Sequence, residues 1–152
     1  MGDGAPGPSL LQLLSHTQHH LTTRVAATLR EQRSSVEEWR VLSLLSDGAG
    51  HSMREVADFA LMPAPSATKL IDRMVSNNLV YRRVDAHDRR RVLVFLSARG
   101  RAAHRKLRPV VEASIDSADE EPLRDLAREL LRRVGPVTAE SVSRQSQPSS
   151  AD

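Results

Sequence analysis

Residues 52–96 decide the fold, and they read SMREVADFALMPAPSATKLIDRMVSNNLVYRRVDAHDRRRVLVFL. The stretch opens with Ser52 three residues before Glu55, a spacing typical of a helix capping box, which predicts a short helix through Ala60. A second helix should follow over Pro65–Ser76, because proline in a first helical turn loses no hydrogen bond and the two asparagines after this range tolerate left-handed backbone. Two short helices joined by a tight turn form a helix-turn-helix.

The pattern changes from helix to strand after this second helix. Residues 79–84 and 92–96 are short apolar runs rich in β-branched side chains, and the charged stretch 85–91 separates them. Two such runs around a polar loop predict a β-hairpin. A hairpin that directly follows a helix-turn-helix predicts a winged helix.

Long helices are expected on both sides of this stretch. Leucine and valine recur at helical spacing over residues 10–30, and a capping pair at Ser35 opens another helix before the motif. Ser97 should begin a long helix, which Pro109 is expected to kink because proline removes a hydrogen bond inside a helix. Leucines on one stripe predict a last helix over 119–134.

The expected fold is therefore mostly α with a small β-hairpin wing, a winged helix-turn-helix between long N- and C-terminal helices. The expected organisation is a flexible N-terminus over 1–8, one domain over 9–136 made of the winged helix at 35–96 with long helices at 9–33 and 97–134, and a disordered tail over 137–152.

The composition excludes several classes of protein. The chain has no cysteine, which excludes disulfides, thiolate metal sites and cysteine nucleophiles. No apolar run approaches the roughly 20 residues needed to cross a bilayer, and residues 1–9 lack the features of a signal peptide, so we expect a cytoplasmic protein without a membrane partner. No nucleophile elbow, metalloprotease helix or phosphate loop is recognisable, so we expect no enzyme, no cofactor and no metal.

The positive charge is concentrated in the middle of the chain. The net charge is only +3, but residues 69–108 carry twelve Lys and Arg side chains against three Asp, and both flanks are net acidic. A basic centre of this kind indicates a nucleic-acid face, because neutralised phosphates supply most non-specific affinity. The alternative is a solvated, arginine-rich surface.

The helix after the turn and the hairpin loop carry the candidate DNA contacts. The helix has short or flexible donors near its positive end, suited to base edges and phosphates, and Ala67 could pack against a thymine methyl group. Five arginines lie on or beside the hairpin, and a narrow minor groove would relieve their mutual repulsion. The candidate contacts are Pro65, Ser66, Ala67, Thr68, Lys69, Arg73, Arg82, Arg89, Arg90 and Arg91.

Two aspartates in the loop, Asp85 and Asp88, are candidates for orienting the wing by pairing with a neighbouring arginine. The alternatives to DNA contact are an ordinary amphipathic helix for residues 65–76 and a solvated turn for residues 85–91.

The chain resembles the MarR family of winged-helix regulators. The resemblance rests on PSATKLIDRM at 65–74, NLVYR at 78–82, DAHDRRRVLV at 85–94 and LSARG at 96–100. It implies a homodimer whose dimerisation region is the first helix and the last two, with major-groove reading by the helix from Pro65 and minor-groove insertion by the wing.

The resemblance also assigns roles to single residues. The family's wing arginine falls on Arg90, with Asp88 as its orienting partner. Lys69 stands where the family often has arginine, which weakens the case for a bidentate guanine contact there. The pair Asn77 and Asn78 replaces the usual glycine-bearing turn.

A small-molecule pocket between the dimerisation helices and the winged helix is a further implication of the resemblance. The candidate lining residues are His16, His20, Arg24, Trp39 and Arg40. Trp39 is more readily explained as a core residue, because it shares the apolar stripe of its helix with Leu42 and Leu45.

Three histidines, His16, His19 and His20, have the helical spacing of a transition-metal site. A polar or interface face of the helix is the favoured interpretation, because no acidic or cysteine ligand lies close by in the sequence.

The sequence thus predicts a sequence-specific, DNA-binding transcription regulator. Its expected partners are double-stranded DNA, a second copy of the chain and a small-molecule effector. A homodimer on an inverted-repeat operator would act as a repressor by occupying a promoter, and the effector would release it. The alternatives are a winged helix that binds an acidic protein partner and an architectural DNA binder without sequence preference.

Overall fold

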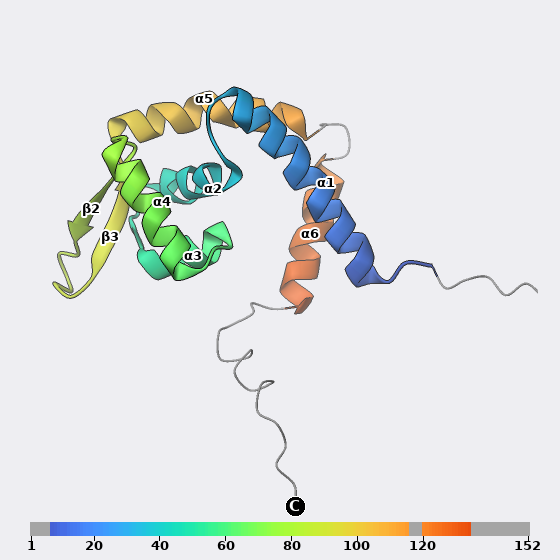
Figure 1. Cartoon of the computed structure of the whole chain (residues 1–152). Helices are drawn as coiled ribbons and strands as arrows, with labels where there is room; N and C mark the ends of the chain where they lie inside the picture. The colour runs from blue at the N-terminus through green and yellow to red at the C-terminus, as the bar shows by residue number, and fades with distance from the viewer. Residues whose placement is uncertain (1–6, 116–119, 135–152) are drawn as a thin grey trace, which may run out of the picture. The chain divides into compact units, whose positions relative to one another are not determined.

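The computed structural model of the chain describes residues 7–115 and 120–134, and the chain divides into two compact units after Ile115 (Figure 1). The first unit contains α1 (Leu10–Glu31), α2 (Val36–Leu44), the short 3₁₀ helix η1 (Leu45–Asp47), β1 (His51–Ser52), α3 (Met53–Ala60), α4 (Ala64–Ser76), β2 (Val80–Val84), β3 (Val92–Leu96) and α5 (Ala98–Ser114). The second unit contains α6 (Glu120–Val134).

The winged helix-turn-helix is confirmed. Helices α3 and α4 pack on each other and on their neighbours, and β2 and β3 pair antiparallel from Val80 opposite Leu96 to Val84 opposite Val92 (Figure 1). The sheet has a third strand that the sequence did not predict, since β1 pairs with β3 and gives the order β1-β3-β2. A strand of two residues has no alternation of its own, so no sequence pattern could mark it.

Serines occupy the N-cap positions of four helices. Ser9, Ser35, Ser52 and Ser97 each accept a hydrogen bond from the backbone N–H three residues later, at 2.9–3.3 Å. Ser52 and Glu55 form a complete capping box, because the Glu55 carboxylate accepts from the Ser52 N–H at 2.7 Å. At Ser35 only half of the predicted box is formed, since Glu38 donates its N–H but its carboxylate makes no bond back.

Three helices end at residues with left-handed backbone. Arg33, Leu61 and Asn78 follow α1, α3 and α4, with φ of 57°, 56° and 55°. Beyond α1 and α4 three N–H groups, and beyond α3 two, donate back to carbonyls near the end of the helix. Asn78 fulfils the expectation for the end of α4. Glycine usually occupies such positions, so an arginine and a leucine there are unusual.

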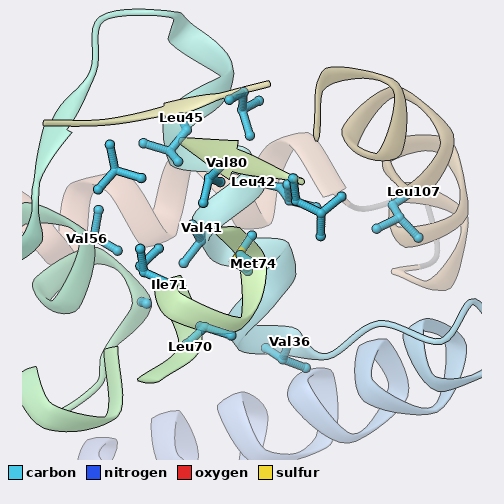
Figure 2. Close-up of a cluster of buried hydrophobic side chains, with 14 of the residues drawn as sticks. Val36, Val41, Leu42, Leu45, Val56, Leu70, Ile71, Met74, Val80 and Leu107 are labelled. Atoms are coloured by element: carbon cyan, nitrogen blue, oxygen red, sulfur yellow. The ribbon is translucent and has the colours of Figure 1, made fainter. Parts of the chain in front are cut away.

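The core of the first unit joins the helix-turn-helix to the sheet and to the long helices. Val41, Leu42, Ile71, Met74 and Val80 are almost wholly buried, and they come from α2, α4 and β2 (Figure 2). Burying one such side chain contributes about 1.5–3 kcal/mol relative to leaving it exposed. The core therefore fixes α4 against the wing, with its polar side left free.

The long helices α1 and α5 belong to the same packed unit. Leu29 of α1 and Leu107 of α5 are buried in the shared core, and α1 packs along α5. Helix α5 continues through Pro109 to Ser114. Helix α6 matches the last predicted helix. No helix within residues 7–115 and 120–134 is long and apolar enough to span a bilayer.

The predictions for residues 1–6 and 137–152 lie outside the described residues. The boundaries expected for the single domain over 9–136 stay predictions.

Candidate DNA interface

Helix α4 presents one polar face to solvent. Ser66, Thr68, Lys69 and Arg73 are exposed, and Pro65 lies in the first turn as expected. The Thr68 hydroxyl donates to the Ala64 carbonyl at 3.0 Å, which leaves its oxygen able to accept a further bond. The polar face begins at the N-terminal end of the helix, where free N–H groups and the helix dipole favour anions.

Ala67 does not belong to that face. It is fully buried, with 0% of its surface exposed, on the same side of α4 as Leu70, Ile71 and Met74. The predicted contact of Ala67 with a thymine methyl group is therefore wrong. The helical repeat places positions 67, 70, 71 and 74 on one stripe, and that stripe is the core side.

Arg73 interacts electrostatically with a glutamate of α2. The carboxyl of Glu38, on α2, has its pKa raised by burial, and the positive charge of Arg73 partly opposes that rise. Arg73 therefore lies near α2 as well as on the exposed surface of α4.

The wing loop is shaped by hydrogen bonds to its own backbone. Asp85 accepts from the His87 N–H at 2.9 Å, and Asp88 accepts from the Arg90 N–H at 3.0 Å. The Arg91 N–H donates to the Asp88 carbonyl at 2.9 Å. Both aspartates thus hold the loop as Asx turns. They bond to backbone N–H groups, and not to a neighbouring arginine side chain as the sequence predicts.

The wing arginines are left for an outside partner. Arg89, Arg90 and Arg91 are exposed, and none of them forms a close ion pair with any residue that the structure describes. Hydrogen bonds from Ser52 lower the pKa of the Glu55 carboxyl, and the charge of Arg91 lies near enough to contribute to that lowering. Three adjacent guanidinium groups repel one another, so their concentration at a turn is unfavourable without an anion. The loop therefore offers a compact positive site at the end of the hairpin.

Arg82 differs from the three loop arginines. Its guanidinium Nη1 donates to Asp72 Oδ1 at 2.8 Å, which links β2 to α4. Asp72 was assigned no role from the sequence, since only the packing of the hairpin beside α4 brings positions ten apart together. Arg82 is better described as a brace between the wing and α4 than as a direct contact.

A stack of side chains supports the other face of the hairpin. The rings of Tyr81 and Phe95 lie 5.5 Å apart and nearly parallel, and the Arg83 guanidinium lies 4.4 Å from the Phe95 ring centroid. Gly50 lies under Phe95 with φ of +75°, and a Cβ there would come within 2.2 Å of the ring. The stack was not predicted, because it joins residues from three separate segments.

The base of the sheet carries a contact between a histidine and an aspartate. His51 Nε2 lies 2.8 Å from Asp47 Oδ2, and the Ala49 N–H donates to the other oxygen of this carboxylate at 2.9 Å. The hydrogen bond from Ala49, and then the contact with His51, hold the pKa of Asp47 below its usual value. The turn before β1 is therefore fixed in shape.

Comparison with known proteins identifies the type of winged helix. The MarR family profile matches residues 34–91, which span α2 to the wing loop. The curated HTH-type transcriptional regulator FarR of Neisseria gonorrhoeae is 25% identical over 107 residues, covering 70% of this chain and 73% of that protein. The part of the chain from α2 to the wing loop therefore matches the MarR family.

Solved structures agree in fold with this chain. A MarR family regulator from Silicibacter pomeroyi superposes with a TM-score of 0.73 at 27% identity, covering 88% of this chain and all of that one. NadR, crystallised with 4-hydroxyphenylacetate, gives a TM-score of 0.76 at 23% identity over 91% of this chain and all of that one. Together these similarities support a DNA-binding transcription regulator of the MarR type.

A small cavity lies where the resemblance to the MarR family implied an effector pocket. It has a volume of about 190 Å³ and is lined by Leu21, Thr22, Val25, Val36, Trp39, Arg40, Val111 and Ile115. Of the predicted lining residues, Trp39 and Arg40 are brought together, whereas His16, His20 and Arg24 are exposed elsewhere on α1.

The two residues that reach the cavity also have structural roles. Trp39 packs on the core and stacks on His104 at 5.1 Å, and Arg40 donates to the Ala60 carbonyl at 3.1 Å. Both the core and the pocket interpretations of Trp39 thus describe part of its surroundings.

The histidines of α1 do not assemble a metal site. His19 and His20 contact edge to face, and no group of three or more metal-ligating side chains gathers within the described parts of the chain.

Two helices of the chain, α1 and α6, expose apolar side chains. On α1 these are Leu10, Leu11, Leu13, Leu14 and Leu21, which are 39–74% exposed. On α6 they are Leu123, Leu126, Leu131 and Val134, which are 57–75% exposed. Apolar patches of this extent are typical of surfaces that another chain covers.

Proposed function

We propose that this MarR-family regulator is a homodimeric repressor that binds an inverted-repeat operator and is released by a small effector. The observation that carries the proposal is the polar face of α4 beside a wing with three unpaired arginines, which the Asp72–Arg82 ion pair ties to that helix. A winged helix uses these two parts for two different grooves.

In the proposed complex α4 enters the major groove. Ser66, Thr68 and Lys69 would read base edges and fix the register on phosphates, and each good base contact discriminates by about 1–3 kcal/mol. Arg89, Arg90 and Arg91 would reach the adjoining minor groove, whose potential is most negative where it is narrow.

The exposed leucines of α1 and α6 support the homodimer. A second copy of the chain would remove these side chains from water, at about 25 cal/mol for each Å² of apolar surface. Two-fold symmetry then predicts half-sites about one helical turn apart on an inverted repeat. A dimer that occupies a promoter excludes polymerase, so repression is the expected sign of regulation in the cytoplasm.

The effector is proposed to bind the cavity beside Trp39 and Arg40. NadR, a structural neighbour, was crystallised with an aromatic carboxylate, and the Arg40 guanidinium offers a similar group a cationic partner. Such a ligand releases DNA only if it binds the DNA-incompetent shape more tightly.

Selection of bound duplexes from a random pool tests the function. We expect enrichment of an inverted repeat, and we expect Lys69→Ala to change the preferred bases within each half-site while Arg30→Ala, on exposed α1, does not. Equal affinity for selected and random duplexes at one salt concentration would indicate an architectural binder. Indifference to all duplexes at low salt would favour a protein-binding winged helix.

The dimer is tested separately by sedimentation. Replacing Leu126 and Leu130 of α6 with lysine should yield monomers, whereas a folded dimer of unchanged mass would exclude these leucines from the interface.

A further inference from the structure

A second and larger cavity lies beside α2, with Glu38 and Leu42 of that helix in its wall. It has a volume of about 570 Å³, within the range of small-molecule sites. The segment after α1, the start of α2, the end of α4 and the first half of α5 form its walls, with Ser34, Glu38, Asn77 and Ala103 among the lining residues. No residue lines both this cavity and the one beside Trp39.

Three cations surround this cavity without a partner. Arg33 comes from the turn after α1, and Arg99 and Lys106 come from α5. None of the three forms an ion pair within the described part of the chain. Glu38 is the one carboxylate in the lining, so the cavity carries a surplus of two positive charges.

The spacing of the cations fits an extended anion. Arg99 and Lys106 lie seven residues apart on α5, which separates them by about 10 Å along the helix axis. Between them the floor is apolar, formed by Leu79, Ala102, Ala103 and Leu107 with Leu42 from α2. A cavity with positive charge at both ends and an apolar floor between them is complementary to a ligand that has two separated negative groups and an apolar middle.

Two features of the chain show strain or unmet bonding at this cavity. Arg33 keeps a left-handed backbone with φ of 57° at a helix end where glycine would be unstrained. The Ser34 hydroxyl oxygen is buried without a hydrogen-bond partner, which is unfavourable for a polar atom. A bound anion would supply an acceptor for a hydroxyl that turns toward the cavity.

We propose that this cavity is a binding site for a small organic dianion, a dicarboxylate with an apolar middle. Arg33, Arg99 and Lys106 hold its two carboxylates through charge-assisted hydrogen bonds, and the apolar floor receives its carbon frame. The site is separate from the proposed effector cavity, because the two cavities share no lining residue.

Calorimetric titration of the full chain with benzene-1,4-dicarboxylate tests the site, with the neutral benzene-1,4-dicarboxamide as the control ligand. We expect the dianion to bind and the amide not to bind. The double variant Arg99→Ala/Lys106→Ala should weaken binding at least about tenfold, because each lost charged hydrogen bond is worth that much or more. Arg105→Ala, which removes a charge from α5 outside the cavity, should bind as the wild type does.

Arg33→Gly distinguishes a loss of binding from a loss of folding. Glycine adopts the left-handed backbone without steric strain, so this variant should keep the thermal stability of the unliganded protein while it loses about tenfold in affinity for the dianion.

Three results would overturn the proposal. They are no binding of the dianion at millimolar concentration, unchanged affinity in Arg33→Gly and in the α5 double variant, and loss of binding in Arg40→Ala alone. The last result would place the anion in the cavity beside Trp39.

Discussion

Truncation of the wing arginine Arg90 to alanine is the sharpest test of how the hairpin meets DNA. The Arg90 side chain has no ion-pair partner among the described residues, and the loop is held through the Arg90 backbone N–H instead. Arg90→Ala should therefore change the free energy of unfolding by less than about 0.5 kcal/mol, as exposed substitutions usually do. Any loss of DNA affinity then reports the contact itself.

The size of the effect follows from counterion release. Each neutralised phosphate contributes about −0.9 to the slope of log K against log salt concentration, and a homodimer loses two such contacts. The slope should thus become shallower by about 1.8. Over a fourfold rise from about 50 to 200 mM salt, the wild-type affinity should fall about twelvefold more than that of Arg90→Ala.

Fluorescence anisotropy with the selected duplex at four salt concentrations measures both slopes. Arg30→Ala, an equal loss of charge on exposed α1, is the matched control and should leave the slope unchanged. Weaker binding by Arg90→Ala with an unchanged slope would refute minor-groove insertion. An equal change in both variants would show that only net charge matters.

Five further substitutions test other parts of the structure. Asp72→Asn and Arg82→Ala should lower DNA affinity equally without changing the salt slope and cost at most about 1 kcal/mol of stability, because the pair is partly exposed; a shallower slope in Arg82→Ala alone would make it a phosphate contact. Burial, with a smaller contribution from a neighbouring arginine, lowers the pKa of His104, so the unfolded chain binds that proton more tightly and stability should fall as pH drops below 6.5. Urea unfolding between about pH 8 and pH 5 measures this. The free energy of unfolding should depend less on pH in His104→Phe than in the wild type, and the same pH dependence in both proteins would contradict the prediction. Gly100→Ala places a Cβ within 2.0 Å of a backbone carbonyl oxygen and should cost about 3 kcal/mol in urea unfolding, whereas Gly48→Ala, with open space around it, should cost about 1 kcal/mol; equal costs would show that the backbone yields.

The local signals in the sequence predicted the helices and the wing well. Ser9, Ser52 and Ser97 mark helix starts through bonds to N–H groups only three residues away, so the information is contained in a few adjacent residues. The missing strand β1 is the opposite case. Its two residues are held by pairing with β3, some forty residues later, and nothing in their own composition requires a strand.

The sequence predicted which residues form the candidate site better than it predicted the contacts that they make. The exposed donors of α4 and the three loop arginines follow from charge and helical period alone. The prediction for Ala67 is wrong because an alanine fits either an exposed helix face or a packed core, and the helical repeat places position 67 on the core side with Leu70, Ile71 and Met74. The brace between Asp72 and Arg82 and the stack on Phe95 could not be found, since each depends on how the hairpin folds back on α4 or on β1.

The side chains proposed to bind ligands contribute little to the stability of the fold. The core consists of apolar residues of α2, α4 and the sheet, with no buried charged side chain within the described residues, whereas Lys69, Arg90 and Arg99 are exposed. Substitutions at these three positions should therefore change binding at nearly constant stability. Arg33 gives the clearest test, because its backbone is left-handed and a glycine there removes the side chain without adding strain. A loss of anion binding in a chain that is no less stable can then be assigned to the missing guanidinium.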